Sequence, residues 1–249
     1  MVKTVIVPFQ PALLLQGEKQ NLIISDLHIG FESKLASNEI FIGKNTTTDE
    51  TIKEIKSIID SVKADSLILL GDVKSSIKSI SKSEWDEVPK FFKNMKEKID
   101  TTLIPGNHDA NIQQLVPDGV SLVSSTGMVI DNILLTHGHT MPSENFSHVE
   151  KIVMGHVHPV FFDKDSVLNG QRVWVSIKTE KQQIFPSASG EIEIIIVPSF
   201  NKYFYATEKK FYKKSISPIL EKIKKYSSAK IVTLDGTIIG NESIIKQIL

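Results

Sequence analysis

Cysteine is absent from the 249-residue chain, and arginine occurs once, at Arg172. The absence of cysteine excludes disulfides, thiolate nucleophiles and zinc sites with Cys ligands, so histidine and carboxylate side chains remain as the strong metal ligands. Long apolar runs are also missing, since the stretch 192–198 is far shorter than the roughly 20 residues that a membrane-spanning helix needs. Neither end resembles a signal peptide, and we therefore expect a cytoplasmic protein without a membrane partner.

An excess of charge of one sign is missing as well, because 29 basic residues balance 29 acidic ones. A chain with zero formal net charge has no global field that would attract nucleic acid, so any basic groove would have to be local. The length is sufficient for one large domain, or for one domain with a small appendage.

The first hundred residues alternate between strand patterns and helical patterns. An opening hairpin leads into a strand that ends near Asp26, and the apolar runs 66–72 and 101–104 predict two further strands. Helical spacing of apolar residues fills the stretches between them, and the second helix is expected to be interrupted near Pro89. Such alternation predicts a parallel sheet covered on both faces.

After about residue 120 the pattern changes to short strands and turns, which a second sheet packed on the first would accommodate. The polar stretch 30–49 is interpreted as an insertion that forms a lid or a dimer contact, and the sequence does not select between a monomer and a homodimer. Residues 208–249 contain a short helical pattern and a hairpin turn at Asp235-Gly236. They are expected to form a small C-terminal appendage to a main domain over residues 1–207.

Six of the seven histidines stand in short polar clusters that directly follow apolar runs, and Asp26 and Asp72 have the same placement. The carboxyl ends of parallel strands open on one edge of a sheet, so side chains far apart in the sequence converge there. Each residue taken alone could be a helix cap, a turn residue or a satisfied interior histidine. Their joint occurrence favours a metal site of oxygen and imidazole ligands, which suits Mn, Fe, Zn, Co or Ni.

These clusters give the sequence a resemblance to the calcineurin-like metallophosphoesterase superfamily, whose blocks are Asp-x-His, Gly-Asp, Gly-Asn-His-Asp/Glu, a lone His and Gly-His-x-His. Between about residues 20 and 200 the blocks occur as Asp26-Leu27-His28, Gly71-Asp72, Gly106-Asn107-His108-Asp109, Thr136-His137-Gly138 and Gly155-His156-Val157-His158. A narrower resemblance is to the archaeal and bacterial branch that includes DNA-ligase-associated phosphoesterases. It depends on the stretch 25–32, on Pro159 and on the Leu-Asp-Gly-Thr tail.

The resemblance implies a four-layer α/β/β/α sandwich that holds two divalent metal ions, with Mn as the first candidate and Fe, Zn, Ni and Co as alternatives. By this resemblance Asp72 bridges the two ions. The remaining ligands are Asp26, His28 and His158 for the first ion, and Asn107, His137 and His156 for the second. His139 is the less favoured ligand of its block and, with Lys74, is a candidate for substrate contact, although a solvated lysine is the alternative for Lys74.

His108 is expected to act on the leaving group, because it stands beside a ligand without being needed as one. Two cations about 3.5 to 4 Å apart clamp a phosphate and lower the pKa of a shared water from 15.7 toward about 7, which gives a hydroxide at neutral pH. In-line attack expels an alkoxide, to which His108 would donate a proton or a hydrogen bond. Asp109 is expected to orient the His108 ring and to favour its protonated form.

A departure from the pattern of protein Ser/Thr phosphatases limits the substrate. Those members of the superfamily carry Gly-Asp-x-Val-Asp-Arg-Gly, whereas Val73-Lys74-Ser75-Ser76 follows Asp72 here, so the arginine that clamps a phosphate is missing. A monoester dianion gains most from such a clamp, and the sequence therefore favours a phosphodiesterase for DNA, RNA or a nucleotide. The alternatives are a phosphomonoesterase and a non-catalytic, metal-binding scaffold for protein interactions.

Overall fold

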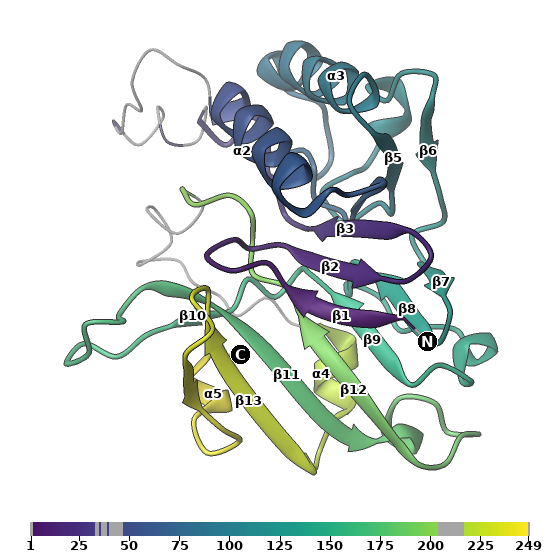
Figure 1. Cartoon of the computed structure of the whole chain (residues 1–249), viewed down its shortest axis with the longest axis vertical. Helices are drawn as coiled ribbons and strands as arrows, with labels where there is room; N and C mark the ends of the chain where they lie inside the picture. Colours follow the sequence, from purple (N-terminus) through teal and green to yellow (C-terminus); the bar gives the residue numbers. More distant parts are fainter. Residues whose placement is uncertain (1, 33–34, 36–38, 40–46, 204–216, 249) are drawn as a thin grey trace.

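The computed structural model describes residues 2–32, 35, 39, 47–203 and 217–248, and the structural statements below concern these residues. Two β-sheets pack face to face (Figure 1). The first sheet contains six strands in sequence order, β1 (Lys3–Ile6), β2 (Leu13–Gln16), β3 (Gln20–Ile24), β4 (Ser66–Leu69), β5 (Asp100–Leu103) and β6 (Val120–Leu122). Strands β3 to β6 are parallel, and β1 to β3 pair antiparallel at one edge, which confirms the predicted hairpin and parallel sheet.

Helices α2 (Thr47–Val62) and α3 (Lys82–Lys96) cover the outer face of the first sheet (Figure 1). Each presents an apolar stripe to the sheet, because its apolar residues recur at three- and four-residue spacing. The predicted interruption of α3 near Pro89 is wrong, since the helix runs through this residue. A proline removes one backbone hydrogen bond of a helix, and burial of Val88, Phe91, Phe92 and Met95 outweighs that loss.

The second sheet has the order β14-β13-β11-β12-β9-β8-β7, with β10 paired to β11 at the side of this path. Its strands are β7 (Met128–Ile130), β8 (Ile133–Thr136), β9 (Lys151–Met154), β10 (Val160–Phe161), β11 (Gln171–Glu180), β12 (Glu191–Ile196), β13 (Ser228–Thr233) and β14 (Ile238–Gly240). Strands β8, β9 and β12 are parallel to one another. The short helices are α4 (Pro218–Lys222), α5 (Ile245–Ile248) and the 3₁₀ turns Ile112–Gln114, Glu144–Phe146 and Lys181–Gln183.

Alternation along the strands decides which side chains fill the space between the sheets. Leu13 enters the layer between the sheets, whereas its neighbour Leu14 packs in the core beneath α2 and α3. In the same way Leu135 faces the first sheet, and Leu134 lies in the core on the outer face of the second sheet. Three apolar layers therefore separate four layers of secondary structure, which confirms the predicted α/β/β/α sandwich. Its fourth layer is thin, because α4 and α5 are short.

Strand β13 pairs with β11, so the C-terminal hairpin predicted at Asp235-Gly236 continues the second sheet. The predicted domain boundary at residue 208 lies outside the described residues, as does most of the predicted insertion 30–49. No helix in the described part of the chain has the length and apolar character required to cross a membrane.

Candidate metal centre

Side chains from five strand ends converge at one edge of the sandwich. Strands β3, β4 and β5 of the first sheet lead to the segments that carry Asp26, Asp72 and Asn107, and β8 and β9 of the second sheet lead to His137 and His156. The histidine and carboxylate atoms that could hold a metal ion form two groups, each with its atoms within 4.8 Å of one another. The groups are Asp26, His28, Asp72 and His158, and Asp72, His137 and His156.

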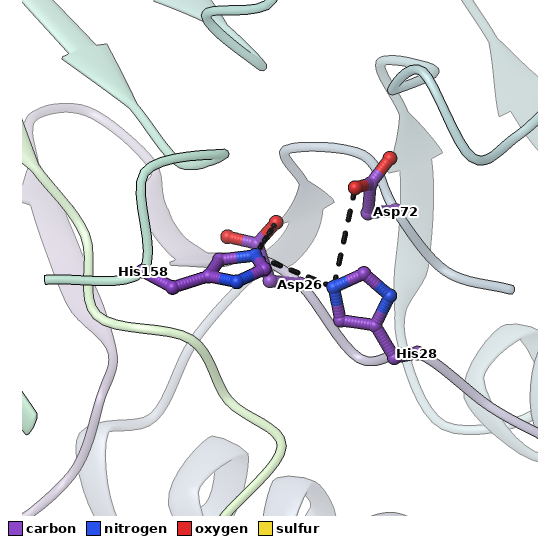
Figure 2. Close-up of side chains that lie close together, drawn as sticks. All are labelled: Asp26, His28, Asp72 and His158. Atoms are coloured by element: carbon purple, nitrogen blue, oxygen red, sulfur yellow. Dashed lines mark hydrogen bonds and ion pairs between the residues drawn. The ribbon is translucent and has the colours of Figure 1, made fainter. Parts of the chain in front are cut away.

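The first group, shown in Figure 2, has the spacing of ligands around one ion. His28 Nε2 lies 3.3 Å from His158 Nε2, and His158 Nε2 lies 2.9 Å from Asp26 Oδ1. Two nitrogens that each lie 2.0–2.1 Å from one ion at a tetrahedral angle are about 3.3 Å apart. All four side chains are buried, so their charges and lone pairs depend on one another rather than on solvent. The donor set and its spacing fit a divalent cation.

The second group is built around His137. The His137 Nδ1–H donates to the Leu70 carbonyl at 2.6 Å, which leaves Nε2 directed at the group. Nε2 lies 3.1 Å from Asn107 Oδ1 and 3.3 Å from Asp72 Oδ1, and the His156 ring centroid lies 5.0 Å from that of His137. The structure thus brings together all three residues predicted for the second ion.

Asp72 belongs to both groups and offers a different oxygen to each. Its Oδ2 lies 4.0 Å from His28 Nε2, and its Oδ1 lies 3.3 Å from His137 Nε2. The backbone N–H of His108 donates to Oδ1 at 2.8 Å, which fixes the orientation of the carboxylate. One oxygen directed at each group is the arrangement that a carboxylate needs in order to bridge two ions.

The backbone is strained at five of these residues, which have positive φ angles although none is a glycine. They are Asp26 (60°), His28 (46°), Asp72 (52°), His156 (70°) and His158 (48°). Each such conformation costs about 1–3 kcal/mol and persists only where surrounding contacts determine it. Hydrogen bonds between the loops hold it here, for example Asp26 N–H to the Gly71 carbonyl at 3.1 Å and His28 N–H to the Asp72 carbonyl at 2.9 Å.

Neighbouring charges set the protonation of the two groups. Burial raises the pKa of the Asp26 carboxyl, but the charge and hydrogen bond of His158, together with the charge of His137, outweigh burial, and this pKa falls to about 2. Burial, followed by the charge of His137, lowers the pKa of His156 to about 4. Burial also lowers the pKa of His137, but Asp72 outweighs it, and the pKa rises to about 9. At neutral pH Asp26 and His156 are therefore in cation-binding forms, whereas a cation bound by His137 must displace a proton.

His108 lies beside both groups, and its ring is oriented by a backbone carbonyl. Its Nδ1–H donates to the Ser75 carbonyl at 2.6 Å, and its Nε2 lies 3.8 Å from Asp72 Oδ2. The predicted contact between Asp109 and this ring is corrected by the structure, because Asp109 accepts backbone N–H groups with both oxygens. Oδ1 accepts from Val73 at 2.9 Å, and Oδ2 accepts from Gly106 at 2.8 Å. Asp109 therefore ties the loop after β4 to the loop after β5.

Burial, followed by the negative charge of Asp72, raises the pKa of Asp109 to about 6.

Lys74 differs from both roles that the sequence suggested for it, since it neither faces the two groups nor is solvated. Its side chain is buried, and its ammonium donates to the Ser76 carbonyl and, at 3.1 Å, to the Ser79 carbonyl. The segment that follows Lys74 turns back toward its side chain, and the carbonyls of this segment accept the ammonium hydrogen bonds that a phosphate would otherwise accept.

His139 is half-buried beside the second group. Its ring centroid lies 5.2 Å from that of His137 and 6.1 Å from that of His156. Burial, followed by the charge of His137, lowers its pKa to about 4, so the ring is neutral at physiological pH. This position is compatible with the predicted contact between His139 and a substrate.

The sequence did not indicate a role for the segment after β12. Side chains of this segment hydrogen-bond to the backbone of the loop that carries Asp26 and His28. Ser199 Oγ donates to the Asp26 carbonyl at 3.0 Å, and Asn201 Nδ2 donates to the Leu27 carbonyl at 2.9 Å. Arg172 in β11 holds this segment through Nη1, which donates to the carbonyls of Ser199 and Phe200. The one signal in the sequence is the occurrence of two polar residues, Ser199 and Asn201, just after the apolar run 192–198.

Replacing Asn201 by alanine is expected to lower both stability and activity. The change leaves the buried Leu27 carbonyl without its side-chain donor, which costs about 1–3 kcal/mol of unfolding free energy. A loosened support behind metal ligands typically costs about 10–100-fold in affinity or activity. Thermal unfolding and metal titration of N201A check both effects, with the exposed Asn241→Ala as the control. Unchanged metal affinity in N201A would contradict the supporting role.

The family model for calcineurin-like phosphoesterases matches residues 22–184. No curated protein matches the sequence significantly. Among solved structures, nuclease MPE of Pseudomonas putida is similar with 17% identity and a TM-score of 0.56, over 96% of this chain and 100% of its own. An archaeal phosphodiesterase is 15% identical with a TM-score of 0.39, over 74% of this chain and 86% of its own. The Escherichia coli phosphoesterase Yfce is 16% identical with a TM-score of 0.41, over 90% of this chain and 98% of its own.

Proposed function

Because the chain belongs to the calcineurin-like phosphoesterase family and is a metal-dependent phosphoester hydrolase, we propose that it is a dinuclear phosphodiesterase for nucleic acid or nucleotides. The observation that carries this proposal is the position of Asp72, which directs one oxygen at each of two buried donor groups. A structural metal site is closed and needs one set of four ligands, whereas two groups that share a carboxylate suit a catalytic pair of ions.

Two divalent cations, with Mn as the first candidate, would be held by the residues of the two groups and by Asn107 Oδ1. When bound, they supply Lewis acidity, which lowers the pKa of a water from 15.7 toward about 7 and holds the phosphate. The buried carboxylates of Asp26 and Asp72 supply the negative charge that balances such cations. The His137–Leu70 hydrogen bond keeps the His137 ring in the tautomer that can bind through Nε2.

His108 is the residue that we assign to the leaving group. Its Nδ1 is occupied by the Ser75 carbonyl, so Nε2 is the nitrogen that can reach a substrate beside Asp72. When a hydroxide forms its bond to phosphorus, the bond to the leaving oxygen breaks, and that oxygen takes the proton from His108 Nε2. The ring then regains its proton from water, so that protons and charges balance over one turnover.

A diester is favoured over a monoester because Arg172 and Lys74, the two cations considered for a phosphate clamp, have other hydrogen-bond partners. Nη1 of Arg172, which is the one arginine of the chain, donates to two backbone carbonyls, and the Lys74 ammonium does the same. A monoester dianion benefits most from a bidentate arginine clamp. The fold is shared with a nuclease from P. putida, which makes DNA and RNA the first natural substrates to test.

Metal-stripped protein is expected to regain hydrolysis of bis(p-nitrophenyl) phosphate, in preference to p-nitrophenyl phosphate, when Mn, Ni, Co, Zn or Mg is added singly. The reason is that the two donor groups hold cations which activate water near a diester phosphate. In H108A, with two ions bound, turnover of a diester with a basic leaving group, such as methyl phenyl phosphate, should fall by about 10²–10⁴-fold because the leaving oxygen receives no proton. The loss on bis(p-nitrophenyl) phosphate should be smaller, because its leaving oxygen is weakly basic.

H148A, which changes a histidine outside the two groups, is the matched control and should retain full turnover. Loss of activity in H108A through loss of metal would contradict the assignment of His108. Absence of turnover with every metal, despite two bound ions, would favour the scaffold alternative. Preference for the monoester would favour a phosphomonoesterase.

A further inference from the structure

We propose that Glu84 is a positioning residue for His108 and acts through the peptide group that joins Ser75 to Ser76. This inference rests on the proposed function, because it concerns the group that serves the leaving oxygen. It replaces the orienting role that the sequence assigned to Asp109 with one that a distant carboxylate performs through the backbone.

Glu84 is fully buried, and its carboxylate is directed at three backbone N–H groups. Oε1 accepts from Ser75 at 2.9 Å and from Ser76 at 2.6 Å, while Oε2 accepts from Ser81 at 2.7 Å. The bond to Ser81 belongs to the capping box of α3. A capping box needs the Ser81 contact alone, so the two bonds to Ser75 and Ser76 go beyond helix capping.

The Ser76 N–H and the Ser75 carbonyl are the two polar ends of one planar peptide group. Glu84 binds the N–H end, and His108 Nδ1 donates to the carbonyl end at 2.6 Å. Carboxylate, peptide and imidazole thus form a chain in which each hydrogen bond polarises the next, by roughly 10–30% per bond. The negative charge of Glu84 makes the Ser75 carbonyl a stronger acceptor, and no proton needs to move between Glu84 and His108.

Neighbouring residues accommodate the carboxylate of Glu84 in the interior of the protein. Gly30 has a φ of 90°, and a Cβ at this position would lie 2.8 Å from Glu84 Cγ, so the absence of a side chain makes room for the glutamate. The ammonium of Lys74 donates to the carbonyls of Ser76 and Ser79, and its positive charge interacts electrostatically with the Glu84 carboxylate. Lys74 and Glu84 together fix the loop that presents the Ser75 carbonyl.

A positioned His108 matters more for a basic leaving group than for a weakly basic one, because a weakly basic oxygen departs without a proton. Methyl p-nitrophenyl phosphate and methyl phenyl phosphate are diesters that differ in this respect. In E84Q with both ions bound, we expect kcat to fall about tenfold more on the phenyl ester than on the p-nitrophenyl ester, with KM unchanged. In H108A the loss of kcat on the phenyl ester should exceed the loss on the p-nitrophenyl ester by an even larger factor.

S81A is the matched control. It removes the other half of the capping box, which destabilises the start of α3, but keeps the Ser81 N–H and the contacts of Glu84 with Ser75 and Ser76. S81A should therefore be destabilised without a change in the ratio of the two kcat values. Equal losses on both esters in E84Q, or the same ratio in E84Q and S81A, would overturn the proposal.

A second readout does not depend on turnover. The hydrogen-bonded Nδ1 proton of His108, identified by its loss in H108A, should give a downfield NMR signal that moves upfield in E84Q and stays in place in S81A. An unchanged signal in E84Q would overturn the proposed chain of hydrogen bonds from Glu84 through the Ser75–Ser76 peptide to His108. If the signal shifts as expected but no diester is hydrolysed with any metal, the proposed function fails while the positioning by Glu84 stands.

Discussion

D72N is expected to lose the second metal ion and at least about 10³-fold of phosphodiesterase turnover, equivalent to about 4 kcal/mol of transition-state stabilisation. The amide keeps the shape of the side chain but replaces one of the two oxygens by an NH2 group, which repels a cation. Because one oxygen of Asp72 faces each donor group, every orientation of the amide removes an oxygen from one of them. Metal content per chain and kcat on bis(p-nitrophenyl) phosphate are the measurements.

The exposed Asp86 of α3 provides the matched control, since D86N makes the same chemical change at the surface. D86N should retain two ions and full turnover. A D72N protein that binds two ions and turns over within tenfold of the wild type would show that the two groups do not share this carboxylate, and the dinuclear assignment would fail.

G155A is expected to lose about 10²-fold in turnover and about 1–3 kcal/mol of unfolding free energy. A Cβ at position 155 would overlap the Ser25 hydroxyl and would lie 2.6 Å from Asp26 Oδ2. The Ser25 hydroxyl is fixed by its bond to the Leu70 carbonyl, and Asp26 also accepts the His156 N–H, so neither can move away freely. The strand ends of the two sheets must then separate, which displaces ligands of both groups.

Gly190 is the control for stability, because nothing lies within 4 Å of a Cβ at that position and its φ of 93° makes alanine strained by about 1–2 kcal/mol. G190A should therefore lower the melting temperature by roughly 2–8 °C and leave turnover unchanged. Equal turnover in G155A and G190A would contradict the argument that the close approach at Gly155 positions the ligands.

Several strands, and the polar residues at their ends, were predictable from the sequence. Buried strands appear as apolar runs, and each run that ends in a polar cluster marks a strand end. The ends of β3, β4, β5, β8 and β9 and the polar residues that follow them could therefore be located from the sequence. Because parallel strands share one direction, their ends had to meet at one edge. This reasoning places Asp26 and Asp72 together within the first sheet, whereas the packing of the second sheet on the first brings His137 to them.

The supports of these candidate ligands, in contrast, follow from the tertiary structure and were not predictable. Ser75, Glu84 and Asn201 act through backbone carbonyls and N–H groups, which are the same in every residue and leave no mark in the sequence. Which of these groups a side chain reaches depends on the path of the loop, and the strained φ angles of the ligands show how strongly neighbouring loops fix that path. For the same reason Lys74, which looks like a surface cation in the sequence, is buried against two carbonyls.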